Sequence, residues 1–303
     1  GMTYRLRERD ERVYPQGELA RRTIGQVGDK GNYGVEYVLR DVLEGRDGKA
    51  RRQRIARGFY GRVVGGDNSE PEDGLDVVTT LDLEMQDVAD RALRRQLEAQ
   101  NALWGTALVM EVATGDLLAM ANLSRTKSGA YAEVKNHALS SRMEPGSTFK
   151  LAALLALVDD AGMSLDETFD TGNGARVKVG RTTVQDSHGL PPLNLKDAVA
   201  HSSNVFFARA VYETYKDDPE RYVDYLRHLH LDRTVGLEEF GAVAPIFPAP
   251  GMKIWYPDVS IVNMGYGYAI ELTPLHTLTL YNAVANDGCM VAPRLVREIP
   301  VSY

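Results

Sequence analysis

The chain has 303 residues, of which 44% are hydrophobic and 25% charged, the balance of an ordinary globular protein with room for one large domain and a smaller one. A net charge of −7 argues against a nucleic-acid partner, because a phosphate backbone is bound by a basic face. The single cysteine, Cys289, excludes an internal disulfide and a cysteine-rich zinc site, and no apolar run approaches the roughly 18–20 residues that cross a bilayer.

The first part of the chain, residues 1–75, is rich in glycine, arginine and aspartate, with short apolar runs between turns. A helix is expected at 34–44, where Val35, Val38 and Leu39 repeat with helical spacing before Gly45 ends it. This part is too small and too rich in loops for a catalytic domain. We therefore predict an accessory module at 1–75 and a catalytic domain at 76–303.

The second part opens with a helix. Thr79 and Asp82 have the Thr-x-x-Asp spacing of a capping box, which marks a helix start. Apolar side chains then recur on one helical face. They are Met85, Val88, Ala92, Leu93 and Leu97.

A β-hairpin should follow, because apolar runs at 106–112 and 116–123 flank the tight turn Thr114-Gly115. Further helices are expected at 151–161, 195–201, 204–215 and from Thr273-Pro274 to Val284. The helix at 151–161 is almost wholly apolar up to Gly162, so we expect it to be buried on all sides. Helices packed on local hairpins predict an α+β fold with an antiparallel sheet, and not a doubly wound parallel sheet.

The segment with the clearest chemistry is Glu144-Pro-Gly-Ser-Thr-Phe-Lys150. Ser147 and Lys150 are three residues apart at a helix start, so their side chains emerge on one face. The free N–H groups of a helix start can also stabilise an oxyanion. Burial against the apolar helix would lower the pKa of Lys150, so that its neutral amine could take the proton of Ser147.

Ser-x-x-Lys alone is a weak signal, because a capping serine near a solvated lysine is common. Two observations favour the chemical interpretation. Lys150 precedes a buried helix, where an idle charge would be costly. A second polar cluster, Ser202-Ser203-Asn204, lies between two apolar helical stretches.

Together these motifs resemble the class B, monofunctional penicillin-binding proteins, and most closely their cell-division (septal) branch. The matching segments follow the family's order along almost the whole chain. They are Arg12-Val-Tyr-Pro15, Val78-Thr-Thr-Leu-Asp82, Ala113-Thr-Gly-Asp116, Glu144–Lys150, Ser202-Ser-Asn-Val205, Leu272-Thr-Pro-Leu275 and Ala285-Asn-Asp-Gly288. The fold implied is the penicillin-binding, serine β-lactamase-like transpeptidase fold, preceded by a small pedestal.

The resemblance implies a peptidoglycan D,D-transpeptidase that β-lactams inhibit. Ser147 would be the acyl-accepting nucleophile, Lys150 its base and Ser202 the proton relay, while Asn204, with Ser203, would bind the substrate. The substrate would be a stem peptide ending in D-alanyl-D-alanine, with no metal and no cofactor. Division or cell-wall synthesis proteins would be partners, on the periplasmic face of the inner membrane, with a membrane anchor upstream of Gly1.

The family's third motif, Lys-(Thr/Ser)-Gly, should follow Asn204. The sequence carries such a triplet only at Lys127-Ser128-Gly129, before the nucleophile and in a polar loop, where a structural role is expected. We therefore expect a transpeptidase domain cut short before its C-terminal strands. Losing one oxyanion donor typically costs about 10²–10³ in rate, so this chain should acylate weakly or not at all.

Two other functions stay open. A serine β-lactamase or β-lactam sensor shares Ser-x-x-Lys, and rapid deacylation would reveal it. A non-catalytic scaffold of the division complex would fit the missing motif. His137, His188 and His201 are too scattered in sequence for a metal site. Residues 265–268 are expected to form a turn, and Asp159-Asp160 a solvated helix end.

Overall fold

A computed structural model describes residues 12–29, 31–49, 52–56, 59–62 and 69–300. Its N-terminal part holds three short helices, α1 (Arg21–Ile24), α2 (Gly34–Val38) and α3 (Arg40–Leu43), and the hairpin of β1 (Arg52–Ala56) and β2 (Phe59–Arg62). The helix predicted at 34–44 is confirmed in place but is not continuous, because the backbone leaves helical geometry at Leu39 and splits it into α2 and α3.

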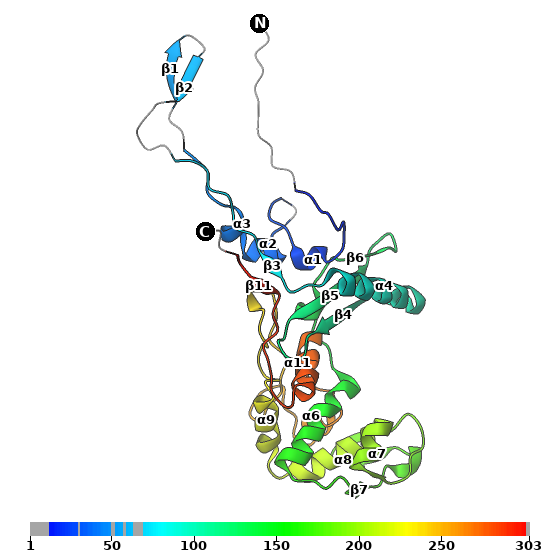
Figure 1. The fold of residues 1–303 in the computed structure, drawn as a ribbon. Coiled ribbons are helices and arrows are strands. Elements are labelled where there is room, and N and C mark those ends of the chain that lie inside the picture. The colour runs from blue at the N-terminus through cyan, green and yellow to red at the C-terminus, as the bar shows by residue number, and fades with distance from the viewer. Residues whose placement is uncertain (1–11, 30, 50–51, 57–58, 63–68, 301–303) are drawn as a thin grey trace.

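The predicted hairpin is confirmed as β4 (Trp104–Met110) and β5 (Leu117–Arg125), which pair antiparallel. The short strand β6 (Tyr131–Ala132) adds to β5 and completes a sheet of order β4-β5-β6. Helix α4 (Leu83–Gln100) packs across both long strands (Figure 1).

The start and the buried face of α4 differ from the expectation. Asp82 itself caps the helix, its carboxylate accepting from the backbone N–H of Met85 at 2.9 Å, so the capping box from Thr79 is wrong. Leu97 is buried as predicted, but Met85 and Val88 are exposed. The other buried residues of the helix are Gln86, Ala89 and Asp90, so its buried face is turned by about one position.

Side chains bond the backbone of β5 at Met120 and Asn122, beyond the short strand β6. The amide of Gln86 both accepts from the backbone N–H of Met120 (2.7 Å) and donates to its carbonyl oxygen (3.3 Å). Glu133 accepts from the backbone N–H of Asn122 on β5 (3.2 Å) and from that of Arg22 on α1 (2.7 Å). Glu133 therefore ties the N-terminal part of the chain to the sheet.

Helices fill the other half of the molecule (Figure 1). Their bounds are α6 (Lys150–Leu155), α7 (Leu195–His201), α8 (Asn204–Tyr215), α9 (Pro219–His228), α10 (Ser260–Met264) and α11 (Pro274–Ala285). The predictions for α7, α8 and α11 are confirmed. The helix predicted at 151–161 is correct in place but not uniform, since it turns into a π-helix at Ala156–Asp160. Val158 is exposed, so it is not buried on all sides.

Small elements connect these helices. They are α5 (His137–Ser140), the 3₁₀ turns Gly146–Phe149, Gly172–Gly174 and Glu238–Phe240, and the strand pairs β7 (Thr168–Phe169) with β10 (Leu193–Asn194) and β8 (Val177–Val179) with β9 (Thr182–Val184). The main apolar core joins α6, α8, α9 and α10 around Phe149, Phe206 and Phe207.

The last described residues return to the segment that precedes α4. Strand β11 (Val296–Glu298) pairs antiparallel with β3 (Val78–Thr79). The buried carboxylate of Asp116 at the hairpin turn lies 2.6 Å from a guanidinium nitrogen of Arg294 and 3.4 Å from one of Arg297. Because it is buried and doubly paired, Asp116 fixes this segment beside the sheet.

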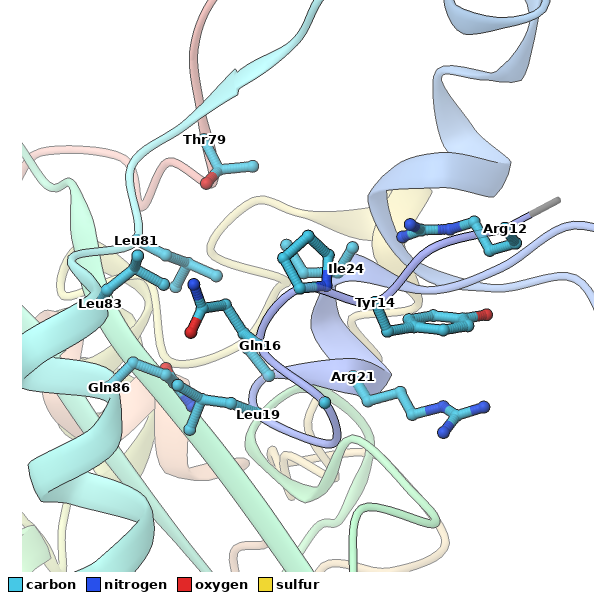
Figure 2. A pocket seen from close by; sticks show the side chains of 13 residues that line it. Arg12, Tyr14, Gln16, Leu19, Arg21, Ile24, Thr79, Leu81, Leu83 and Gln86 are labelled. Atoms are coloured by element: carbon cyan, nitrogen blue, oxygen red, sulfur yellow. The ribbon is translucent and has the colours of Figure 1, made fainter.

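A cavity of about 240 Å³ lies where the N-terminal part meets the start of α4 (Figure 2). Apolar side chains such as Leu19, Ile24 and Leu83 line it, and the guanidiniums of Arg12 and Arg21 lie over the ring of Tyr14 at its rim. None of its lining residues belongs to the Ser147 motif. Within the described ranges, no helix has the length and apolar character needed to cross a membrane.

Candidate active site

Ser147 lies in the 3₁₀ turn Gly146–Phe149 directly before α6, and it is exposed. The sequence favours this turn because Gly146 adopts a positive φ of 57°, which is unstrained only for glycine. The hydroxyl of Thr148 closes the turn by donating to the carbonyl oxygen of Pro145 (2.8 Å). The phenol of Tyr281 on α11 donates to the carbonyl oxygen of Thr148 (3.1 Å). The hydroxyl of Ser147 therefore stands on a braced turn and faces solvent.

The turn at 265–268 has a role that the sequence did not reveal. The backbone N–H of Gly146 donates to the carbonyl oxygen of Gly267 at 2.9 Å. A Cβ atom on Gly267 would lie 1.9 Å from the carbonyl oxygen of Gly146, so only glycine fits there. Residues 265–268 do form a turn, but it is packed against the residue that precedes the nucleophile.

Lys150 begins α6 and is buried, with only 5% of its surface exposed. Its Nζ lies close to four oxygen atoms: 3.1 Å from Ser147 Oγ, 2.5 Å from Ser202 O, 3.0 Å from Ser202 Oγ and 2.7 Å from Asn204 Oδ1. Burial lowers the pKa of Lys150 to about 8, although the negative charge of Asp186 opposes the shift. The direction predicted from the sequence is thus confirmed, and a substantial fraction of Lys150 is neutral near pH 8.

These four contacts orient the neutral amine. Two of the oxygens, Ser202 O and Asn204 Oδ1, can only accept hydrogen bonds, so they take the two N–H groups of a neutral amine. The lone pair is then left facing the hydroxyls of Ser147 and Ser202, which can donate. The arrangement therefore points the lone pair of a neutral Lys150 at the hydroxyl of Ser147.

Ser202 and Asn204 lie at the corner between α7 and α8. Ser202 ends α7 in the left-handed conformation, with φ of 52°, and is exposed. This reversal aims both its carbonyl and its hydroxyl at Lys150. Asn204 is the first residue of α8 and is half-buried. The structure thus brings Ser147, Lys150, Ser202 and Asn204 together.

Ser203 is a correction. It is completely buried, and its hydroxyl donates to Asp186 Oδ2 (2.8 Å) while accepting from the backbone N–H of Phe206 (3.0 Å). With both functions of the hydroxyl used, no face is left for a substrate, so the predicted binding role does not hold. Ser203 is the N-cap of α8, and its partner Asp186 was missed in the sequence because no spacing links the two.

The histidines and the Lys-Ser-Gly triplet considered in the sequence lie outside the Ser147 cluster. His188 and His201 are not scattered, since their rings pack edge-to-face 6.5 Å apart beside the Ser202 corner. His137 is a core residue, stacked on Trp104. Lys127-Ser128-Gly129 occupies the exposed turn between β5 and β6.

Asp159 and Asp160 are likewise not simply solvated at the end of their helix. Their carboxylates accept hydrogen bonds from the phenols of Tyr225 and Tyr215, at 2.8 and 2.9 Å.

Comparison with known proteins agrees with this geometry. The family model described as "Penicillin binding protein transpeptidase domain" matches residues 105–301. The "Probable peptidoglycan D,D-transpeptidase PenA" of Neisseria meningitidis is 27% identical over 97% of this chain and 49% of its own length. The "Penicillin-binding protein PbpB" of Mycobacterium tuberculosis is 30% identical over 95% of this chain and 43% of its own.

A solved structure, penicillin-binding protein 3 of Mycobacterium tuberculosis complexed with aztreonam, superposes with a TM-score of 0.76 at 28% identity. The match covers 94% of this chain and 60% of that one. The chain spans about half the length of the curated relatives it matches. The α+β transpeptidase fold and the class B resemblance are confirmed: this chain belongs to the penicillin-binding protein transpeptidase family.

Proposed function

We propose that this chain carries the acyl-transfer centre of a peptidoglycan D,D-transpeptidase. The observation that carries the proposal is the placement of Lys150 Nζ against the hydroxyls of both Ser147 and Ser202. The names of the relatives, which include "Probable peptidoglycan D,D-transpeptidase" and "Penicillin-binding protein", support the same chemistry.

The chemistry would run in two halves. Neutral Lys150 takes the Oγ proton of Ser147, and the oxygen attacks the carbonyl carbon of the D-alanyl-D-alanine amide. Ser202 passes a proton from Lys150 to the departing amine, so terminal D-alanine leaves and the remaining peptide stays as an ester of Ser147. An amine on a neighbouring stem peptide then attacks this ester, forms the cross-link and frees Ser147.

Asn204 would hold the substrate. Its side-chain oxygen accepts from Lys150, which leaves its NH₂ group to donate to a carbonyl of the bound peptide. A β-lactam would use the same groups, and the ester it leaves would hydrolyse slowly. None of these steps calls on a metal or a cofactor.

The wider role is part of the same proposal. A relative named "Probable peptidoglycan D,D-transpeptidase FtsI" from Caulobacter vibrioides is 27% identical over 99% of this chain, which favours septal wall synthesis. The substrate lies in the cell wall, so the site would face it from the envelope side of the inner membrane. Division and wall-synthesis proteins would be its partners.

The test is covalent labelling with a fluorescent penicillin, followed by mass spectrometry of the labelled peptide. We expect a slowly formed ester on Ser147 that is absent from the Ser147→Ala variant. An adduct on another residue, or none after prolonged incubation with excess penicillin, would overturn the proposal. A fast adduct would instead overturn only the expectation of weak activity.

The rate at which the ester is lost separates the main alternative. A serine β-lactamase would release the opened drug within seconds to minutes of acylation. A transpeptidase centre would stay blocked, because its site does not activate water. Repeating the assay after removing free drug therefore distinguishes the two.

A further inference from the structure

Asp186 is a buried carboxylate beside the reacting groups that the mechanism above does not use. It follows β9 in the chain, and only 6% of its surface is exposed. Its Oδ1 accepts from the backbone N–H groups of Asn204 (2.5 Å) and Val205 (3.2 Å), and its Oδ2 accepts from the hydroxyl of Ser203 (2.8 Å).

These contacts complete the N-terminus of α8 from another segment of the chain. Asp186 satisfies the first two N–H groups of the helix, and Ser203 satisfies the third, at Phe206. A negative charge is also stabilised at the positive end of a 12-residue helix. The start of α8 is therefore held in place relative to β9.

The residues held in this way are the partners of Lys150. Asn204 donates its backbone N–H to Asp186 and offers its side-chain oxygen to Lys150. Ser202, next to the Ser203 that Asp186 bonds, has the left-handed conformation that turns its carbonyl and hydroxyl toward Lys150. Displacing Asp186 would release both.

The charge of Asp186 also reaches Lys150. It raises the pKa of the amine and so offsets part of the lowering by burial. The nearby titratable groups are His188, on the segment of Asp186, and His201, which precedes Ser202; both are exposed.

We infer that Asp186 is a positioning residue, which fixes the Ser202–Asn204 corner against Lys150 and places a negative charge beside the partners of that amine. This inference rests on the proposed function, because it assigns Asp186 a place in the same acyl-transfer centre. Asp186 does not touch the substrate; it acts through Lys150, Ser202 and Asn204.

Two substitutions separate its two effects. Asp186→Asn removes the charge but keeps an oxygen for the backbone N–H groups of α8, whereas Asp186→Ala removes both. In Asp186→Asn we expect the acid limb of the pH–rate profile of Ser147 acylation to shift to lower pH, by about half a pH unit or more. Asp186→Ala should in addition lower the plateau rate by about 10²-fold, since the corner is no longer positioned.

The matched control is Asp82→Asn, which alters the capping carboxylate of α4, a helix on the sheet. It should leave the pH profile in place. A purely structural role for Asp186 predicts lower melting temperatures for both variants with an unmoved acid limb, and that result would overturn the inference. So would an Asp186→Ala variant that acylates at the wild-type rate.

A second measurement does not depend on acylation. The 13Cε shift of Lys150 in lysine-labelled protein, assigned with Lys150→Arg, reports its titration directly around a pKa of about 8. A lower midpoint in Asp186→Asn supports the inference even if penicillin never labels Ser147, which would defeat only the proposed function. An unchanged titration midpoint of Lys150 in Asp186→Asn overturns the inference about Asp186.

Discussion

Lys150 is buried and Glu133 is half-buried, in two different regions, and the loss of contact with water moves the pKa of each toward neutrality. The pKa of Lys150 falls to about 8, and that of Glu133 rises to about 7. Their partners differ. Lys150 contacts the hydroxyls of two exposed serines, whereas Glu133 contacts the backbone N–H groups of Arg22 and Asn122.

The difference shows what a shifted pKa does and does not indicate. Desolvation alone moves both groups, so the shift reports burial. Only Lys150 faces groups that can exchange a proton and reach a substrate. Glu133 instead holds α1 to β5, as a structural residue would. The partners, and not the shift, identify the reactive site.

The largest expected change is in the rate of Ser147 acylation, when Lys150 is replaced by a permanently charged residue. Lys150→Arg keeps a cation at the site but cannot accept the proton of Ser147, so acylation should fall by about 10²–10⁴-fold. The rate of Ser147 ester formation with penicillin measures it. The exposed Lys135→Arg is the control and should acylate as the wild type does.

Because a guanidinium is larger than an ammonium, the fold of the Lys150→Arg variant is checked by its thermal unfolding, and Lys150→Met serves as a second variant. The comparison also requires that Glu133→Gln leaves the acylation rate unchanged. A folded Lys150 variant that acylates at the wild-type rate would show that this lysine is not the base.

The next largest expected effect is a loss of stability in Gly267→Ala. The new methyl group would lie 1.9 Å from the carbonyl oxygen of Gly146, and the residue has a positive φ of 94°. We expect the free energy of unfolding to fall by about 3 kcal/mol, with slower acylation because the turn that carries Ser147 must move.

Gly241→Ala is the matched control for this substitution. Gly241 has nearly the same φ, 93°, but a Cβ atom there would meet no atom within 4 Å. It should cost only the backbone strain of about 1 kcal/mol. If urea unfolding shows the same loss of unfolding free energy for Gly267→Ala and Gly241→Ala, the close Gly146–Gly267 contact does not stabilise the turn that carries Ser147.

The sequence predicted those parts of the site that depend on local spacing. Ser147 and Lys150 share one helical turn, and the polar Ser202–Asn204 corner between two apolar stretches set the ends of α7 and α8. What it did not predict depends on contacts between distant segments. No periodicity connects Asp186 with Ser203, or Gly267 with Gly146.

The same reasoning explains the errors within single elements. The residues of α4 that face the sheet were misjudged at Met85 and Val88, because Gln86 is buried in order to bond the backbone of Met120. A buried polar residue is invisible to a pattern of apolar positions. The change from α6 to a π-helix at 156–160 is likewise not marked by any break in the apolar run 151–158.

The smallest expected effect is a pH dependence of stability caused by Glu133, the structural residue in the comparison with Lys150. Its pKa is raised from 4.5 to about 7, chiefly by burial, with Asp90 adding to the shift and Arg94 opposing it. Between these two values the folded state holds a proton that the unfolded state has lost. Stability should therefore fall as the pH rises through this window, by on the order of 2 kcal/mol, and level off above about 7.

Glu133→Gln cannot titrate, so this pH dependence should disappear, while the exposed Glu84→Gln should retain it. Urea unfolding across the window measures the effect. Hydrogen exchange of the Arg22 and Asn122 amides locates it, because those N–H groups lose a full carboxylate acceptor in the variant. If both variants keep the wild-type pH dependence, the loss arises elsewhere, and Glu133 is not the carboxylate whose ionisation loosens the contact between α1 and β5.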